Sequence, residues 1–221
     1  MPAVTMVTLE AHGQTLWLLP ERAVFLPESD TLIVADAHVG VTDESLAVLS
    51  DLVRRLEVNR IVFLGDFLHV ARAEPAAMAA VLRWRERHGR LELTLVRSRL
   101  DPRIVEPPAV LDVQAVDEPL MHRGLALCHR PQPIAGAFVL AGYVYPCVSI
   151  GGRRHDWQRL PCFWFSPHFG VLPAFGTFTG MQAIKPAKGE RIFGAAADRV
   201  FELLPRPKPP KPLAELRDAR D

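Results

Sequence analysis

The sequence predicts an α/β fold, a mixed β-sandwich flanked by α-helices, formed by a single domain over residues 1–204. Three observations support this prediction. Short apolar runs alternate with stretches of helical periodicity in the first half of the chain. Beyond residue 110 the pattern changes to strands separated by turns. The chain has 221 residues, of which 49% are hydrophobic and 23% charged, an ordinary balance that can fill a substantial core.

Three buried strands are expected in the first half of the chain. Residues 31–35 (TLIVA) and 60–64 (RIVFL) are apolar runs typical of strands buried on both faces, and residues 91–96 form a third strand. A helical pattern separates each strand from the next, so the order is β-α-β-α-β. This order predicts parallel pairing with right-handed crossovers.

Two amphipathic helices are expected between these strands. Thr42 or Asp43 can cap the first helix, whose apolar residues recur at helical spacing as far as Leu56. Pro75 opens the second helix, and Gly89 is placed to end it. Both helices therefore have an apolar face that can cover the sheet formed by the three strands.

Shorter strands are expected at the N-terminus and in the second half of the chain. They are residues 6–9, 16–19, 23–26, 125–128, 138–141, 147–150, 160–165 and 191–196. The tail at 205–221 begins with a run too rich in proline for a helix or a sheet, so an extended basic linker is expected there.

The composition narrows the classes of function and the location. A formal net charge of +1 gives no global basic field, although it is compatible with a local basic groove. Cys128, Cys147 and Cys162 form no CxxC pair, which argues against a disulfide framework or a zinc knuckle and favours a reducing cytoplasm. No stretch is apolar enough to span a bilayer, and the N-terminus lacks a signal-peptide pattern. We therefore expect a cytoplasmic protein without membrane association.

Polar residues follow the expected strands at their carboxyl ends, which is where open α/β sheets bind ligands. They are Asp36 and His38 after the first strand, Asp66 after the second, residues 98–101 after the third, and His129 after a later one. Taken singly, each cluster is more often a turn or a helix cap. Carboxylate and imidazole donors that converge from separate strands suit manganese, iron or zinc. The combination therefore favours a metal site.

The sequence also resembles a known family. The order Asp36-x-His38, Gly65-Asp66, His129 and Gly142-x-x-x is similar to that of the calcineurin-like metallophosphoesterases. The closest resemblance, over roughly residues 5–200, is to the bacterial ligase-associated DNA damage response phosphodiesterases. It is carried by 64–69 (LGDFLH), 128–133 (CHRPQP), 160–165 (LPCFWF), 170–176 (GVLPAFG) and 178–180 (FTG). It implies two metal ions, often manganese, that activate a water to attack a phosphodiester of nucleic acid, and a DNA ligase or helicase as a companion.

The resemblance assigns roles to four retained residues. Asp36 and His38 match ligands of the first metal, Asp66 matches the carboxylate that bridges both metals, and His129 matches a ligand of the second metal. The loop that follows the first motif, at Gly40, is shorter than the lysine-containing loop of the family. At most one divalent ion, manganese, is expected to be retained, on the side of the first metal.

Other positions of the family pattern carry different residues. The asparagine ligand is replaced by Arg99, the catalytic histidine by Leu100, and two later histidine ligands by Tyr143 and Tyr145, whereas Asp101 is retained. Leu100 has no proton to donate, Arg99 has no lone pair, and a neutral phenol is a poor metal donor near neutral pH. The second metal site is therefore expected to be lost.

Three arginines are candidates for binding phosphate without hydrolysing it, namely Arg97, Arg99 and Arg130. The guanidinium of Arg99 can replace the positive charge of the lost metal, neutralise Asp66 and bind a phosphate through two hydrogen bonds. The alternative for Arg97 and Arg130 is that they point outward as solvated charges.

Two main functions follow from these residues. The first is a catalytically degenerate metallophosphoesterase, a pseudoenzyme with weak or no hydrolytic activity that binds a phosphate-bearing ligand or a repair protein, because the whole far half of the site has changed. The alternative is an active one-metal, manganese-type phosphodiesterase or nuclease, which the retained carboxylates and histidines support. A different reaction at the two tyrosines is a third possibility, for which the sequence gives no positive indication.

Overall fold

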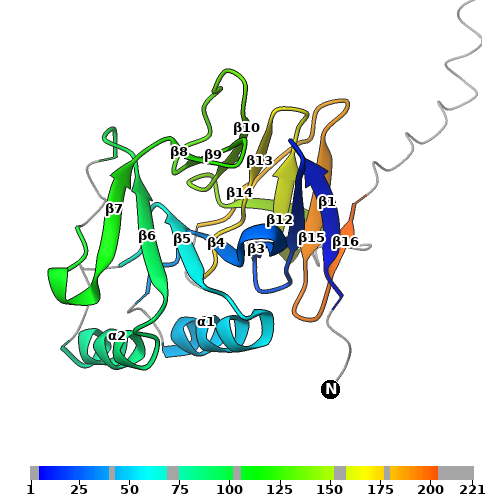
Figure 1. The fold of residues 1–221 in the computed structure, drawn as a ribbon. Coiled ribbons are helices and arrows are strands. Elements are labelled where there is room, and N and C mark those ends of the chain that lie inside the picture. The colour runs from blue at the N-terminus through cyan, green and yellow to red at the C-terminus, as the bar shows by residue number, and fades with distance from the viewer. Residues whose placement is uncertain are drawn as a thin grey trace, which may run out of the picture.

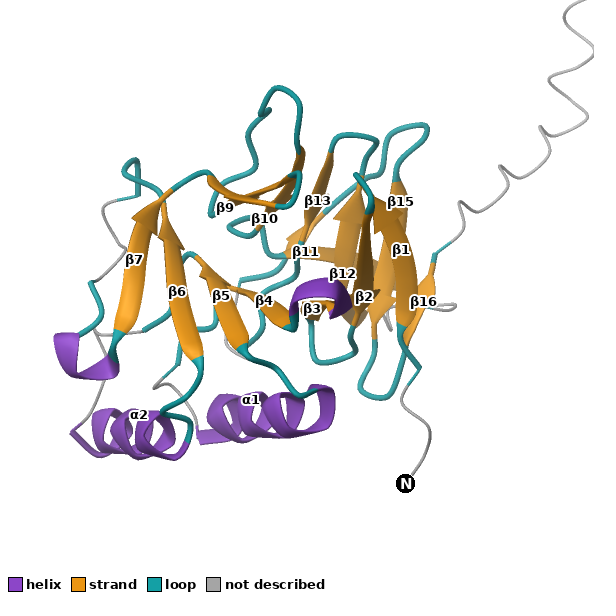
Figure 2. Ribbon diagram, in the orientation of Figure 1, coloured by secondary structure: helices purple, strands orange, loops and turns teal. Residues whose placement is uncertain are grey.

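Two stacked β-sheets and two α-helices make up the part of the chain that the structure describes (Figures 1 and 2). The structure is a computed structural model, and it describes residues 5–39, 43–68, 75–101, 106–151, 158–176 and 180–203. The mixed α/β architecture predicted from the sequence is confirmed, with mostly β-sheet and two helices. The tail at 205–221 and the shortened loop that begins at Gly40 lie outside the described residues.

The first sheet has its strands in the same order as the chain. They are β1 (Val7–Ala11), β2 (Gln14–Leu18), β3 (Ala23–Leu26), β4 (Thr31–Ala35), β5 (Arg60–Leu64), β6 (Glu92–Arg97) and β7 (Val113–Asp117). The first four pair antiparallel, and β4 to β7 pair in parallel. The helices α1 (Asp43–Leu56) and α2 (Pro75–Arg87) connect β4, β5 and β6, so the predicted parallel β-α-β-α-β unit is confirmed.

The second sheet is mixed and contains the later strands. They are β8 (Leu120–His122), β9 (Leu125–Cys128), β10 (Phe138–Ala141), β11 (Pro146–Ile150), β12 (Gln158–Phe165), β13 (Phe169–Val171), β14 (Gln182–Ala183), β15 (Arg191–Ala195) and β16 (Val200–Glu202). Strand β10 pairs in parallel with both β9 and β13. Short 3₁₀ turns lie at Pro27–Ser29 and Ala109–Leu111.

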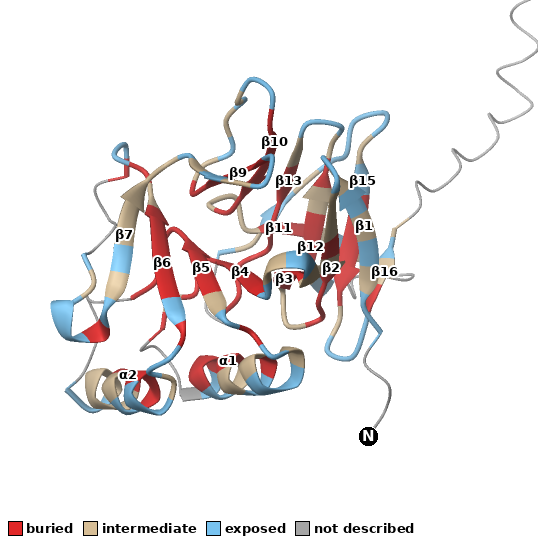
Figure 3. Ribbon diagram, viewed as in Figure 1, coloured by how far each residue is buried: buried red, intermediate tan, exposed pale blue. Residues whose placement is uncertain are grey.

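Two apolar layers hold the fold together (Figure 3). The helices lie on one face of the first sheet, and Leu49 of α1 and Trp84 of α2 are buried in that layer. The second sheet covers the other face. Successive residues of β4 point to opposite faces, so Leu32 belongs to the helix layer and Ile33 to the layer between the sheets. This explains why residues 31–35 are apolar throughout.

The sequence did not predict five short or half-exposed strands. Strand β7 has a mostly intermediate burial pattern, and β8, β13, β14 and β16 are two or three residues long. Such segments have too few residues to show a period of two. These segments become strands because the fold places them beside an existing strand. The backbone N–H and C=O groups at the edge of that strand then find hydrogen-bond partners in them.

The structure also tests the expectations about cysteines and membranes. Cys128, Cys147 and Cys162 are all free and buried, so the prediction of no disulfide framework is confirmed. Within the described residues, neither helix is long and apolar enough to cross a membrane.

We predict that Gly170→Ala destabilises the layer between the sheets. A Cβ at Gly170 would lie 2.6 Å from Cε1 of the Phe165 ring and 3.0 Å from Cδ2 of Leu140. Such overpacking costs about 1–3 kcal/mol, and each kcal/mol lowers the melting temperature by about 2–4 °C in a domain of this size. Gly180→Ala is the matched control, because no atom lies within 4 Å of the added Cβ. Equal melting temperatures for the two variants would contradict this packing.

Candidate functional site

The predicted strand-end residues are brought together by short backbone contacts between loops. The His38 amide donates to the Asp66 carbonyl oxygen at 2.9 Å, which joins the loops after β4 and β5. The Tyr143 amide donates to Oδ2 of Asp36 at 2.8 Å, which joins the first sheet to the loop after β10. The Gly142 amide donates to the His129 carbonyl at 3.0 Å. Loops from four strands therefore meet at one site.

The centre of the site is a buried carboxylate and imidazole. Oδ1 of Asp36 and Nε2 of His129 lie 3.3 Å apart, and both side chains are fully buried. Among the described residues, neither atom has a hydrogen-bond partner of good geometry, and Nδ1 of His129 also lacks one. Buried polar atoms are almost always hydrogen-bonded in proteins. Two such atoms that face one another at 3.3 Å therefore mark this pair as a candidate for binding a ligand or an ion.

Two glycines make room for this pair. A Cβ at Gly65 would lie 2.0–2.7 Å from atoms of the His129 ring, so the imidazole rests directly on the Gly65 backbone. A Cβ at Gly142 would lie 2.8 Å from Oδ2 of Asp36 and 2.9 Å from Cβ of Ala35. Gly65 also has a φ of +83°, which side chains rarely adopt. Any other residue at either position would displace the buried pair.

The backbone of the site is strained. Asp36, His38, Tyr143 and Tyr145 all have positive φ, at 45°, 43°, 69° and 52°. Such a conformation is uncommon for residues other than glycine, and it is most unusual for a bulky tyrosine. Strain of this kind costs roughly 1–3 kcal/mol per residue and clusters at functional sites. Other residues of the chain also have positive φ, but here four of them, two of which are tyrosines, lie in two loops that contact one another.

The two tyrosines lie against the two histidines. The Tyr145 hydroxyl is 3.4 Å from Nε2 of His38. The Tyr143 ring meets the His129 ring edge-on with centroids 5.3 Å apart, and the Arg130 guanidinium lies 4.3 Å above the Tyr143 ring. The tyrosines therefore stand beside the imidazoles, as their place in the sequence pattern predicted.

The Asp66 carboxyl is half-buried beside other acidic groups. Burial raises its pKa above the usual value of 3.8, and the neighbouring Asp36 carboxylate raises it further. His38 and His129 lower this pKa, and Asp101 raises it. Asp66 also follows Gly65, whose backbone the His129 ring contacts, so Asp66 and His129 lie near one another. Three acidic side chains, those of Asp36, Asp66 and Asp101, therefore lie close to one another at the site.

These residues fit a divalent cation in part. The facing Oδ1 and Nε2 atoms of Asp36 and His129 are oxygen and nitrogen donors of the kind that manganese, iron or zinc prefers. A complete set of ligands is not preformed, because no group of three or more His, Cys, Asp or Glu side chains in the described ranges is arranged to hold a metal ion. The resemblance assigned these two residues to different metals, whereas the structure places them side by side.

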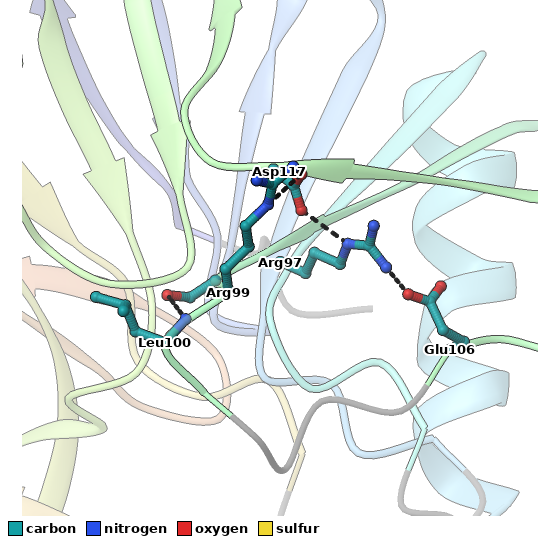
Figure 4. Close-up of polar contacts among 6 residues, drawn as sticks. Arg97, Arg99, Leu100, Glu106 and Asp117 are labelled. Carbon is teal, nitrogen blue, oxygen red and sulfur yellow. Dashed lines mark hydrogen bonds and ion pairs between the residues drawn. The ribbon is translucent and has the colours of Figure 1, made fainter.

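The loop after β6 divides into a buried and an exposed pair. Ser98 and Asp101 are buried, whereas the Leu100 residue is 78% exposed and the Arg99 side chain 81% exposed. Nε of Arg99 donates to Oδ2 of Asp117 at 2.7 Å (Figure 4), and Arg99 is not among the described groups whose charge shifts the pKa of Asp66. The expectation that Arg99 neutralises Asp66 is therefore wrong. Its guanidinium has a nearer carboxylate, which β7 supplies.

The three candidate arginines differ in their partners. Arg97 donates to Oδ1 of Asp117 at 3.0 Å and also forms an ion pair with Glu106, so Arg97, Arg99 and two carboxylates form one chain of alternating charges (Figure 4). Arg130 lies over Tyr143, and no carboxylate in the described part of the chain forms an ion pair with it. Arg130 is thus the candidate whose charge is available to an anion.

Sequence reasoning missed Asp117 and Glu118, at the end of β7. Asp117 binds both Arg97 and Arg99. Oε2 of Glu118 accepts hydrogen bonds from the His129 amide at 2.8 Å and the Arg130 amide at 2.9 Å. The only signal in the sequence is an acidic pair before a proline, which is too common to single out a site.

Among solved structures, the crystal structure of the Pseudomonas putida nuclease MPE is similar to this chain. The two share 41% sequence identity and superpose with a TM-score of 0.80. The match covers 90% of this chain and 100% of the nuclease chain. No protein-family model matches the chain, and no curated protein matches it.

We predict that Asp66→Asn raises the melting temperature of the metal-free protein at neutral pH. A raised pKa means that the fold favours the protonated carboxyl, so its contribution to stability is complete below the usual value of 3.8 and is lost as pH rises through the raised value. Thermal melts in a chelating buffer should show the gain at neutral pH and its disappearance in acid.

Asp117→Asn is the control for this experiment. The hydrogen bond from Arg99 lowers the pKa of Asp117, so removal of this charge should give no gain at neutral pH. A melting temperature of Asp66→Asn at or below that of the parent at neutral pH would show that the Asp66 charge is already compensated.

Proposed function

Because this chain belongs to the family of the nuclease MPE, we propose that it binds nucleic acid through a phosphodiester at the strand-end site and hydrolyses it weakly or not at all. The main support for this proposal is that part of the site keeps the residues of the family pattern and part does not. The buried Asp36 and His129 are retained beside Asp66, whereas the surrounding catalytic positions hold Leu100, which is exposed and apolar, and two tyrosines.

The retained half supports binding of one divalent cation, and manganese is the ion that we propose. Asp36 and His129 provide two buried donors, and the acidic side chains beside Asp66 favour a cation at this place. A divalent cation bound there would polarise a phosphoryl oxygen and lower the pKa of a bound water. His38 lies at the edge of the same cluster, where Tyr145 contacts it.

The altered half supports weak or absent hydrolysis. A general acid or base typically contributes 10²–10⁴-fold to a rate, and Leu100 has no proton to transfer. Arg99 is turned towards Asp117, so its charge does not replace the missing donor. The tyrosines at 143 and 145 occupy the neighbourhood of the histidines but are poor metal ligands near neutral pH, because a phenol has a pKa of about 10.

An active one-metal nuclease is the second candidate. Two observations favour it. Oδ1 of Asp36 and Nε2 of His129 have no hydrogen bond among the described residues, and the backbone around them is strained. Backbone strain costs free energy and clusters at functional sites. The solved relative is itself a nuclease. Association with a DNA ligase or helicase and a role in the DNA damage response stay predictions of the resemblance.

Arg130 is the proposed contact to the phosphodiester. It follows the site residue His129 directly, and the Tyr143 ring holds its guanidinium in place. A guanidinium binds phosphate through two parallel hydrogen bonds. Arg97 and Arg99 are less suitable, because a phosphate would have to displace the carboxylates that already bind them.

We predict little or no turnover of bis-p-nitrophenyl phosphate by the parent protein with manganese. Joint restoration of the family residues (Arg99→Asn, Leu100→His, Tyr143→His and Tyr145→His) should raise the rate by orders of magnitude. Single restorations should do little, because catalytic residues that act as a unit are strongly non-additive. The rates are measured by release of p-nitrophenol with and without a chelator.

One result would overturn the degenerate assignment. If the parent hydrolyses the substrate rapidly in a metal-dependent way, and Asp36→Asn abolishes this activity, the one-metal nuclease is correct. Rapid hydrolysis that Asp36→Asn leaves intact would place the activity in a contaminant or at another site.

We also predict that Arg130→Ala weakens binding of a single-stranded oligonucleotide about tenfold or more. A hydrogen bond to a charged group contributes about 1.5–3 kcal/mol, and the loss of one phosphate contact should lower the salt dependence of the dissociation constant by about one unit. Fluorescence anisotropy at several salt concentrations measures both quantities. Arg99→Ala is the matched control and should have a smaller effect, because Asp117 already neutralises Arg99. Equal effects of the two substitutions would show that Arg130 has no special role.

A further inference from the structure

Glu118 lies where the chain passes from the first sheet to the second. Strand β7 ends at Asp117 and β8 begins at Leu120, so Glu118 belongs to the short connection between the two sheets. Its own amide donates to the Arg97 carbonyl at 2.9 Å, which fixes it to the end of β6. The backbone position of Glu118 is therefore set by the first sheet.

The Glu118 side chain reaches the second sheet. Its Oε2 atom accepts from two successive amides, those of His129 at 2.8 Å and Arg130 at 2.9 Å. Hydrogen bonds from amides to a carboxylate are shorter and stronger than those between neutral groups. One carboxylate oxygen thus holds the turn that follows β9.

The place of the His129 ring depends on this turn. The imidazole rests on the Gly65 backbone and lies 3.3 Å from Oδ1 of Asp36, with the Tyr143 ring edge-on against it. Both Gly65 and Asp36 belong to the first sheet, whereas His129 belongs to the second. A small displacement of the turn would therefore either press the ring into Gly65 or move Nε2 away from Asp36.

We propose that Glu118 is a positioning residue that holds the His129 imidazole against Asp36 and sets the direction of Arg130. This proposal rests on the proposed function, because it assumes that His129 and Arg130 serve the site. Glu118 acts through the backbone amides and does not itself contact the substrate. Through Glu118, the end of the first sheet fixes the position of His129 and Arg130, which follow a strand of the second sheet.

The test compares three variants of the full chain. Glu118→Ala removes the acceptor, Glu118→Gln keeps a carbonyl oxygen that can accept both amides, and Asp117→Ala removes the neighbouring acidic side chain, which binds only Arg97 and Arg99 among the described residues. The manganese dissociation constant is measured by titration calorimetry. The ring resonances of His129 are recorded by NMR in a chelating buffer.

Glu118→Ala is expected to weaken manganese binding about 10–100-fold, the usual effect of removing a group that orients a metal ligand. It should also shift the His129 ring resonances. Glu118→Gln should restore both measurements to near the parent values, and Asp117→Ala should leave both unchanged. If Glu118→Ala does not fold, Glu118→Asp takes its place, because the shorter side chain withdraws the acceptor and is expected to act in the same direction.

Two results separate this proposal from the proposed function. If the parent binds no manganese, the proposed cation site fails, and Glu118 is then judged on the metal-free His129 resonances alone. A shift in Glu118→Ala that Glu118→Gln reverses supports the positioning role in either case. Unchanged resonances in Glu118→Ala, or an equal loss of manganese binding in Asp117→Ala, would overturn it.

Discussion

The contact between the Asp36 carboxylate and the His129 imidazole constrains the rest of the site. Both side chains are fully buried, and their facing atoms lie 3.3 Å apart without a hydrogen bond of good geometry. Burial of polar atoms without partners is costly. The fold accepts this cost at the pair, and the glycines at 65 and 142 are required there because no Cβ fits beside it.

This pair also joins the two sheets. Asp36 follows β4 of the first sheet, and His129 follows β9 of the second, so their relative position depends on how the sheets stack. The apolar layer between the sheets sets the coarse position. Hydrogen bonds from the amides of Tyr143 and His129 to carboxylates of the first-sheet side set the fine position. The site is accordingly a property of the interface between the sheets, since neither sheet contains it alone.

The electrostatics of the site are uneven. Burial raises the pKa of Asp66, and the neighbouring Asp36 and Asp101 carboxylates raise it further. Arg97 and Arg99, on the loop side of β6, do not neutralise these carboxylates, because both bind Asp117 at the surface. The acidic side chains in this partly buried place favour a cation, whereas Arg130 beside them favours an anion. A phosphodiester with its counter-ion satisfies both requirements.

The sequence by itself determined the strands at 31–35 and 60–64, both helices and the residues at the strand ends. Local patterns suffice for these elements, because a continuous apolar run or a helical period is visible within a short stretch of sequence. It also placed Asp36, His38, Asp66, His129, Tyr143 and Tyr145 at strand ends, where open α/β sheets bind ligands. Only the tertiary structure decided which of these side chains are in contact, and that Arg97 and Arg99 bind Asp117. Arg97 pairs in register with Asp117 only because β7 lies beside β6. Strand β7 is half-exposed and polar, so no local pattern predicts it. Both the direction of Arg99 and the hydrogen bond from the His129 amide to Glu118 depend on this strand.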